Sequence, residues 1–311
     1  MSRAVGLHVG LILLLLAMNF VLPAYHHGNL ARIMVLAVYA MSYNIMFGYT
    51  GLLSLGHAMF FTAGMYGMGL SMRLWDMPVG GAFLVGIVAA AGFSLVVGLL
   101  ALRTIGVAFM IVTLMFSQAV FLTILYFNPI TRGDEGFVIP QAARQIAGID
   151  LSDANNRYLA AWMLFSVCLL AVLALVRSRV GRVLIAIREN EERARMLGYD
   201  TWAHKLAAVV MSGTMAGAAG AAYGALFGSV GASFAEVPFS ILPLLYVLLG
   251  GPGTVIGPFV GTFFMFYLRD LSGTLTDAHM LVAGLVLIGL TLFARRGIMG
   301  LVRERWAKWL P

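Results

Sequence analysis

The sequence predicts an all-α, polytopic transmembrane helix bundle of about 8–10 spans, some of them short, broken or re-entrant. Of the 311 residues, 61% are hydrophobic and 11% are charged, whereas a soluble domain has about 25% charged residues. The charges also leave long gaps, for example between Arg32 and Arg73 and between Glu236 and Arg269. Each gap can hold the roughly 20 apolar residues that a membrane-spanning helix needs.

The apolar segments follow one another along the whole chain. We expect them at residues 6–24, 30–47, 51–71, 79–101, 105–127, 157–176, 206–230, 237–249, 254–268 and 279–294. The first could instead be a signal peptide, because Arg3 precedes a Leu-rich stretch. It lacks a small-x-small cleavage site and further spans follow it, which favours a membrane helix.

Two breaks interrupt the uncharged runs, at Gly48-Tyr49-Thr50-Gly51 and at Gly250-Gly251-Pro252-Gly253. Glycine and proline break helices, so the flanking segments are either full spans or re-entrant hairpins. Residues 177–205 and the carboxyl-terminal tail are both rich in Arg, which predicts a cytoplasmic location for both. An even number of crossings must then separate them. This favours a true reversal at the Gly-Pro break, with short helices buried in protein.

The same count places the amino terminus inside and the loop of residues 128–156 outside. The net charge of +7 lies beside apolar spans and therefore reflects topology, not nucleic-acid binding. The single Cys168 supports neither a disulfide nor a cysteine metal cluster. His26 and His27 are expected in a solvated loop, so no metal site is predicted.

Glycines recur at four-residue spacing, which places small residues on one helix face. Such faces allow close helix packing in lipid, either within one bundle or between subunits. The predicted packing or hinge positions are Gly213, Gly217, Gly250, Gly251, Pro252, Gly253 and Gly257.

The most informative stretch is the polar loop of residues 177–205. Apolar positions recur in it at helical spacing, namely Val183, Leu184, Ile187, Ala194 and Leu197. Two short helices ending at Gly198 fit this pattern, because glycine is preferred just after a helix end. The loop is too polar for lipid and too amphipathic for an idle linker. We expect it to dock on another protein.

This loop resembles the coupling loop of LivM-type permeases, the membrane subunits of branched-chain amino acid ABC importers. The resemblance rests on Gly181-Arg-x3-Ala186-Ile-Arg188-Glu189-Asn190, followed by Ala194-x2-Leu197-Gly198 and Lys205. Two further blocks agree, Asn44 to His57 and Leu249 to Pro258. The resemblance extends from about Leu36 to Gly261 and implies a single permease domain over residues 1–311, similar to ten-span, type II-like ABC importer permeases.

The resemblance also implies a division of labour in the bacterial inner membrane. A second, LivH-like permease would complete the pathway, two cytosolic ATPases would dock on the coupling loops, and a periplasmic binding protein would deliver substrate. This chain has no Gly-x4-Gly-Lys-Ser/Thr phosphate loop, so ATP would be bound by the partners and no cofactor by this chain. The implied coupling residues are Gly181, Arg182, Ala186, Ile187, Arg188, Glu189, Asn190, Ala194, Leu197 and Gly198.

Polar residues inside spans are costly in lipid and are candidates for the pathway. The preferred set is Asn44, Gly48, Gly51, Ser54 and His57, and Thr62, Thr113, Ser117 and Gln118 are further candidates. Broken backbone in transporters often lines a cavity. The alternative role is hydrogen bonding between helices. For the hydroxyls of Thr113 and Ser117, a bond to their own helix backbone is expected.

The substrate stays open within the family. Few buried charges are available for a zwitterion, so the binding protein would do most of the selecting. The cargo would be branched-chain or other hydrophobic amino acids, or alternatively urea, short amides or aromatic acids. A secondary transporter is a weaker alternative, because intramembrane carboxylates are scarce. An enzyme is not predicted, because no His-Glu-x-x-His or paired-Asp motif occurs in the spans.

Overall fold

The computed structural model describes residues 2–146, 148–275, 284, 289 and 297–305, and it has the predicted all-α bundle. The helices are α1 Ser2–Val21, α2 Ala24–Asn44, α3 Ala58–Trp75, α4 Val79–Ala101, α5 Val107–Tyr126, α6 Asn128–Thr131, α7 Ala154–Arg177, α8 Arg179–Glu189, α9 Glu191–Met196, α10 Thr201–Phe227, α11 Val237–Gly250, α12 Gly257–Leu275 and α14 Gly297–Arg305. The short strands are β1 Phe137–Val138, β2 Gln145–Ile146, β3 Ile149–Asp150 and β4 Ser229–Val230.

Six helical segments in the described part of the chain are long and apolar enough to cross a membrane. They are Ala4–Val21, Tyr25–Tyr49, Val79–Ala101, Val107–Tyr126, Ala154–Arg177 and Thr201–Phe227. Helix α11 is apolar but only 14 residues long, as expected for a short helix. The predicted segment 279–294 lies outside the described residues, apart from residues 284 and 289. The chain is thus a multi-pass membrane protein.

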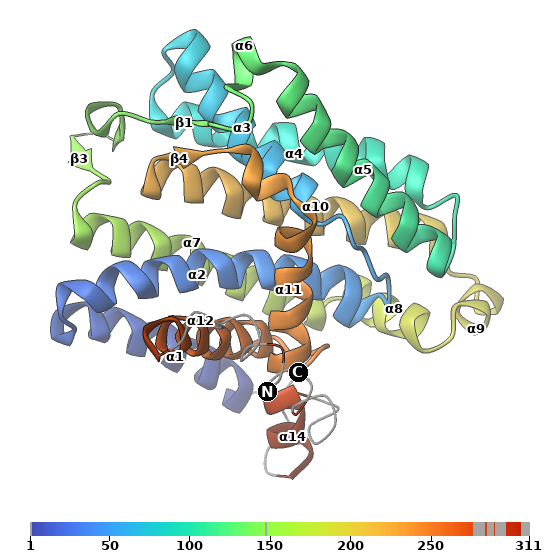
Figure 1. Ribbon diagram of the computed structural model, residues 1–311. Helices are drawn as coiled ribbons and strands as arrows, with labels where there is room; N and C mark the ends of the chain where they lie inside the picture. Colours follow the sequence, from blue (N-terminus) through green and yellow to red (C-terminus); the bar gives the residue numbers. More distant parts are fainter. Residues whose placement is uncertain (1, 147, 276–283, 285–288, 290–296, 306–311) are drawn as a thin grey trace.

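The long helices α2, α7 and α10 run side by side between two ends of the bundle (Figure 1). Helices α8 and α9 lie at one end, and strands β1 and β3 lie at the other. Helix α2 is the central helix, with 83% of its most apolar window buried, because α7, α10, α11 and α12 surround it. Helix α1 is attached to α7, where Tyr158 Oη donates to the carbonyl of Leu15 at 2.6 Å.

Small residues let α3, α4 and α10 pack closely. A side chain at Gly217 would overlap Ala90 of α4, and one at Gly213 would overlap Ser94. Gly64 of α3 faces the backbone of Gly217 in the same way. The glycine stripe of α10 therefore packs inside this bundle.

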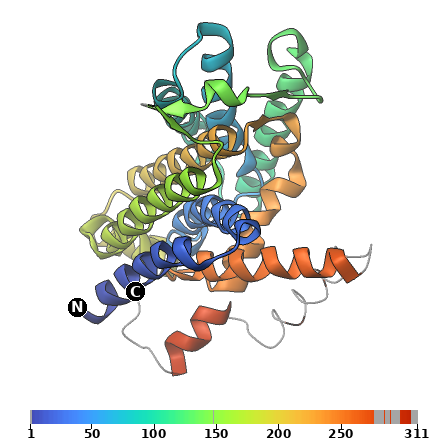
Figure 2. The ribbon, with the colours of Figure 1, turned by 90° about the vertical axis from the view of Figure 1, so that its left-hand side faces the viewer.

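The loop of residues 128–153 lies across the end opposite α8, which faces the viewer in Figure 2. Strand β1 pairs with β4 in antiparallel register, Phe137 opposite Val230, and β2 pairs with β3. Residues 137–139 of this loop therefore cover the outer end of α10 through backbone hydrogen bonds.

Both predicted breaks are present. Helix α2 passes into a π-helical turn, Ile45–Tyr49, and residues 51–57 are irregular, so the helix expected from residue 51 begins only at Ala58. The second break separates α11 from α12, so the helix is interrupted at the predicted Gly-Pro position. Helix α12 is longer than the expected 254–268 because its last turns, from Arg269 to Leu275, include polar residues that the apolar pattern excludes.

The expectation of a solvated loop around His26 and His27 is wrong. Pro23 fixes an extended backbone just before residue 24, and α2 starts there, earlier than the apolar run. His26 Nδ1 lies 3.2 Å from Tyr267 Oη, and the His27 ring lies 5.2 Å from the Tyr158 ring. Within the described residues, no three His, Cys, Asp or Glu side chains gather as a metal site would require.

Candidate functional site: the coupling helices and the two backbone breaks

The predicted coupling segment folds as two short helices because a side chain caps each one. Ser178 Oγ accepts a hydrogen bond from Gly181 N at the start of α8, at 3.2 Å. Asn190 Oδ1 accepts one from Arg193 N at the start of α9, at 2.8 Å. Such caps satisfy amides that the first helical turn leaves unpaired. Gly198 follows the end of α9 with φ +88°, a conformation that glycine adopts without strain.

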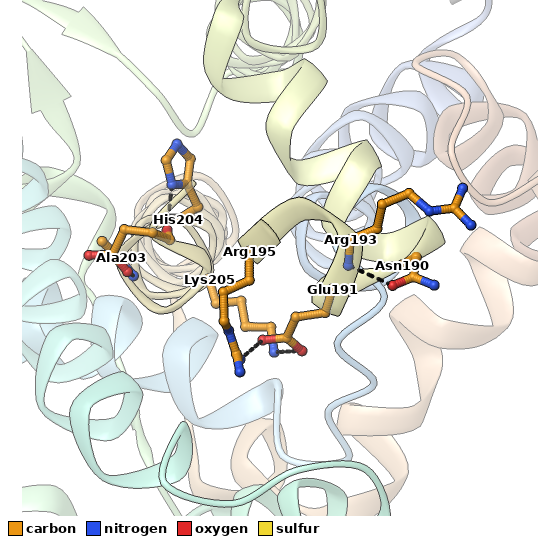
Figure 3. A network of polar contacts seen from close by, with 8 residues as sticks. Asn190, Glu191, Arg193, Arg195, Ala203, His204 and Lys205 are labelled. Atoms are coloured by element: carbon orange, nitrogen blue, oxygen red, sulfur yellow. Dashed lines mark hydrogen bonds and ion pairs between the residues drawn. The ribbon is translucent and has the colours of Figure 1, made fainter. Parts of the chain in front are cut away.

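A polar network joins α9 to the start of α10 (Figure 3). Glu191 accepts from Lys205 Nζ and, at 3.5 Å, from Arg195 Nη2. Burial alone would raise the pKa of Glu191, but the Lys205 ammonium outweighs it and holds that pKa below its ordinary value. Asp200 caps α10 through Ala203 N at 3.0 Å. The short helices are thus fixed to the long helix α10.

The two faces of α8 and α9 differ as the helical spacing predicts. Val183, Leu184, Ile187 and Ala194 are buried. Among the other predicted coupling residues, Ala186 is half-buried, and Arg182, Arg188, Glu189, Asn190 and Gly198 are exposed. Gly181 is buried against the last turn of α7, where any side chain would overlap the backbone of Leu175 and Val176.

Leu197 departs from the pattern of the buried apolar positions. It is 72% exposed, and its neighbour Met196 is 83% exposed. Tyr199 and Trp202, each 45% exposed, lie next to them in sequence. We call Met196, Leu197, Tyr199 and Trp202 the apolar tip. It lies at the polar end of the bundle, where an exposed apolar patch marks an interaction surface.

Arg188 connects α8 to the first break. Its Nη1 donates to the carbonyl of Gly48 in the π-helical turn. A side chain at Gly51, where φ is +79°, would lie 3.3 Å from Arg188 Cγ. At Gly253, in the second break, a side chain would lie 2.8 Å from Arg188 Nη1. The absence of side chains at Gly51 and Gly253 therefore lets one arginine reach both breaks.

Asn44 joins the two breaks directly. Its Nδ2 donates to the carbonyl of Thr254 at 2.9 Å, and its Oδ1 accepts from Gly253 N at 3.0 Å. Asn44 is fully buried. Both interactions satisfy backbone groups that the interrupted helix would otherwise leave unpaired. A side chain at Gly48 would overlap this amide.

Further contacts close the second break. Thr254 Oγ1 donates to the carbonyl of Gly251 at 2.7 Å, and a side chain at Gly257 would overlap that hydroxyl. Pro252 is half-buried in the same turn. Gly250 is pressed against the backbone of Gly257, so α11 and α12 cross tightly.

Arg303 of α14 also reaches the second break, where its Nη1 lies 3.4 Å from the carbonyl of Gly253. Sequence reasoning did not single out Arg303 as a site residue, since only the positive charge of the tail was visible. Its contact places α14 and α8 at the same end of the bundle. This agrees with an even number of crossings between the two basic segments.

Ser54 and His57 lie deeper, in the irregular segment that leads into α3. Both are fully buried. His57 Nε2 bonds Ser42 Oγ at 2.9 Å, and its ring lies between Tyr39 and Tyr43, at 5.4 and 5.1 Å. The predicted pathway residues thus divide into two groups. Gly48 and Gly51 meet Arg188 of the coupling helix, and Asn44 joins the two breaks. His57 lies among aromatic rings, and the carbonyl of Ser54 accepts from Tyr43 Oη at 2.9 Å.

Hydroxyls of α5 meet two irregular segments. Leu55 N donates to Thr113 Oγ1 at 3.2 Å, and Thr113 also bonds its own helix at Met110, as expected. The expectation of a bond to its own backbone is wrong for Ser117. Its Oγ instead lies 3.4 Å from the carbonyl of Ala235, in the 3₁₀ turn Ala232–Ala235 before α11. These hydroxyls satisfy broken backbone inside the membrane.

Helix α5 is the most exposed span, with 22% of its apolar window buried. Its exposed face carries Ile111, Met115, Gln118 and Leu122. A primary amide in the middle of a span is costly against lipid. Gln118 thus places a polar side chain on an otherwise apolar exposed face.

At the outer end, a cavity of about 530 Å³ lies between α3 and the loop of residues 132–143. Its charged lining residues are Arg73, Asp76 and Arg132. It opens at the opposite end of the bundle from α8.

Comparison with known proteins decides the family. Residues 27–291 match the family model described as branched-chain amino acid transport system / permease component. The chain belongs to this family. The match covers both breaks and the coupling helices, and the protein is a permease component of an ABC transporter.

Curated LivM permeases are similar to the chain. The chain is 28% identical over 305 residues to the high-affinity branched-chain amino acid transport system permease protein LivM of Escherichia coli, covering 88% of this chain and 69% of the relative. The LivM protein of Salmonella typhimurium matches with the same identity and coverage. A probable branched-chain amino acid transport permease protein LivM of Methanocaldococcus jannaschii is 28% identical over 155 residues, covering 49% of this chain and 44% of the relative.

Proposed function

We propose that this permease imports branched-chain or other hydrophobic amino acids across the bacterial inner membrane, driven by ATP hydrolysis on partner subunits. The partners would be a second, LivH-like permease, two cytosolic ATPases and a periplasmic substrate-binding protein. The observation that carries the proposal is the hydrogen bond from Arg188 of the coupling helix to the carbonyl of Gly48 in the first break. The chain itself would bind neither ATP nor another cofactor.

The ATPase would dock on residues 177–205, through the apolar tip. Three of its four side chains are exposed outside the apolar spans, and the fourth, Trp202, is exposed in the first turn of α10. Burying one leucine-sized side chain at an interface contributes about 1.5–3 kcal/mol. Charged neighbours such as Glu192 and Arg193 would form the polar rim.

Movement of the docked ATPase would reach the pathway through rigid connections. The Glu191–Lys205 pair makes α9 and α10 move together. Arg188 passes the same displacement to Gly48, and Asn44 passes it to Gly253 and Thr254. Both breaks are turns without regular helix, so they can change dihedral angles with little loss of helical hydrogen bonding. They are the hinges in this proposal.

The substrate would pass along the exposed face of α5, between this chain and the second permease. Gln118 supplies the polar group on this face, and Met115 and Leu122 supply apolar contact. Such a surface suits a hydrophobic side chain better than it suits two fixed charges. Urea, short amides and aromatic acids, which do not carry two fixed charges, are the alternative cargoes.

Reconstitution tests the proposal. The chain would be placed in liposomes alone and with its permease, ATPase and binding-protein partners, and leucine uptake would be measured with and without ATP. We expect uptake only by the complete, ATP-supplied assembly. ATP-independent uptake by the isolated chain would contradict the proposal and favour a secondary transporter.

A further inference from the structure

Three arginines from distant segments meet at the outer end of α10, and the proposed transport function uses none of them. Arg32 of α2 and Arg157 of α7 place their Cζ atoms 5.1 and 5.7 Å from the centre of the Phe227 ring. Arg144, in the outer loop, donates from Nη1 to the carbonyl of Leu226 at 3.3 Å. We call Arg32, Arg144 and Arg157 the arginine cluster.

In the described part of the chain no carboxylate forms an ion pair with the cluster, and Asp150 acts on Arg144 only from a longer distance. The ion pairs within 4.0 Å in the described part of the chain are those of Glu191, at the other end of the bundle. Asp153 acts on Arg157 from nearby, but it caps α7 by accepting from the amides of Asn155 and Asn156. The carbonyl end of α10 and the ring of Phe227 favour cations but provide no counter-charge.

Two guanidinium donors of the cluster are also unused. The Nε atoms of Arg144 and Arg157 are buried from solvent, and neither has a hydrogen-bond partner in the structure. A buried donor without a partner costs about 1–3 kcal/mol, more when it is charged. Three positive charges with two buried free donors are the environment that a phosphate group satisfies.

An apolar groove of about 320 Å³ begins beside the cluster. Its lining is entirely apolar and comes from α4, α7 and α10, closed by two residues of the outer loop. The lining residues are Val79, Gly80, Phe83, Ile146, Leu151, Ala160, Met163, Leu164, Val167, Ala222, Ala225 and Leu226.

The groove and the cluster are continuous. Leu226 lines the groove, and its carbonyl accepts from Arg144. Leu151 also lines it, and its amide donates to the carbonyl of Arg144 at 2.9 Å. On α7, Ala160 and Leu164 follow Arg157 by three and seven positions, so they share its face.

We propose that this site binds an anionic phospholipid. The phosphate lies against Arg144 and Arg157, with Arg32 adding a third charge, and one acyl chain lies in the groove between α4, α7 and α10. A soluble anion would use the cluster but leave the groove empty. The proposal depends on the chain lying in a membrane and not on its cargo.

Native mass spectrometry of the purified chain tests the lipid. Phosphatidylglycerol and phosphatidylcholine with identical acyl chains would be compared, and inorganic phosphate would be tested separately by thermal unfolding. We expect preferential retention of phosphatidylglycerol, and a loss of roughly fivefold in its affinity for each of Arg144→Gln and Arg157→Gln. Arg103→Gln, an exposed arginine at the opposite end, is the matched control and should retain the lipid.

The groove is tested by Gly80→Phe. A Cβ atom there meets no atom within 4 Å, and Gly80 lines the groove, so the position accepts a side chain that occupies it. It should weaken phosphatidylglycerol binding while all three arginines remain. Equal retention of both lipids, or stabilisation by inorganic phosphate as large as that by phosphatidylglycerol, would overturn the proposal. If Gly80→Phe binds the lipid as well as the wild type does, the acyl chain does not lie in this groove.

Discussion

The guanidinium of Arg188 donates a hydrogen bond to the backbone carbonyl of Gly48, 140 positions earlier in the chain. Arg188 belongs to a polar helix outside the membrane, and Gly48 belongs to a buried break in the central helix α2. Few side chains could make this link, because it needs a long, planar donor and a carbonyl left free by an interrupted helix. It joins helix α8 to the first break.

Removing the link should uncouple the transporter. Arg188→Glu is expected to leave membrane insertion intact and to lower ATP-driven leucine uptake at least tenfold, because a carboxylate is repelled by the Gly48 carbonyl. ATP hydrolysis by the assembled complex should continue. The two rates would be measured in parallel in liposomes, with Arg103→Gln as a control that keeps both. If ATP hydrolysis still drives uptake in Arg188→Glu, the conformational change does not depend on this hydrogen bond.

The Asn44 amide should be a major source of stability at the breaks. Asn44→Leu leaves Gly253 N and the Thr254 carbonyl buried without partners, at a cost of about 1–3 kcal/mol each. We expect a clear fall in the unfolding temperature in detergent. Asn29→Leu on the same helix is the control, since Asn29 Nδ2 is buried without a partner and its removal should be neutral or stabilising. Equal unfolding temperatures of the two variants would show that the Asn44 hydrogen bonds do not stabilise the breaks.

Gly48 should tolerate no side chain. In Gly48→Ala the new methyl group would overlap Asn44 Oδ1 and approach Gly253 N to 2.7 Å, so the two breaks must separate. Overpacking of this kind costs about 1–3 kcal/mol. Gly92→Ala, where a methyl meets nothing within 4 Å, should be neutral or slightly stabilising. The unfolding temperatures and the uptake rates of Gly48→Ala and Gly92→Ala would be compared to test this difference.

The apolar tip should determine ATPase affinity. Leu197 is 72% exposed, so Leu197→Asp should leave the permease folded. It should weaken ATPase binding about tenfold or more, because the lost burial of a leucine is worth about 1.5–3 kcal/mol. Pull-down or surface binding with the purified ATPase measures this. Val138→Asp, equally exposed at the outer end, should bind normally, and an unaffected Leu197→Asp would exclude the tip as the dock.

Acid should loosen the connection between α9 and α10. The folded-state pKa of Glu191 lies below its ordinary value because Lys205 stabilises the carboxylate against the opposing effect of burial. The resulting stability is fully present above the ordinary glutamate pKa of about 4.3 and is lost as the pH falls through the lowered one. The protection factors of residues 191–196, which correct measured exchange for the intrinsic pH dependence of amide exchange, should therefore fall below about pH 4.5 in the wild type. In Glu191→Gln the protection factors should be low and constant across this range, and a pH response of the variant equal to that of the wild type would contradict the role of the pair.

The local features of the coupling segment could be predicted because they depend on neighbours in the chain. The apolar spacing of Val183, Leu184 and Ile187 is enough to give α8 a buried face, and Gly198 is enough to end α9. The exposure of Leu197 could not be predicted, since the same spacing allows a buried or an exposed leucine. Whether a partner element covers that position is decided by packing.

Composition and the gaps between charges determined that this protein is a polytopic helix bundle, and the blocks around Gly48, Arg188 and Gly253 determined its family resemblance. Only the tertiary structure decided that these three blocks meet, with Asn44 and Arg188 joining them. The reason is physical: hydropathy and helical period report the local environment of each residue, whereas hydrogen bonds between segments up to 210 positions apart depend on how the helices pack.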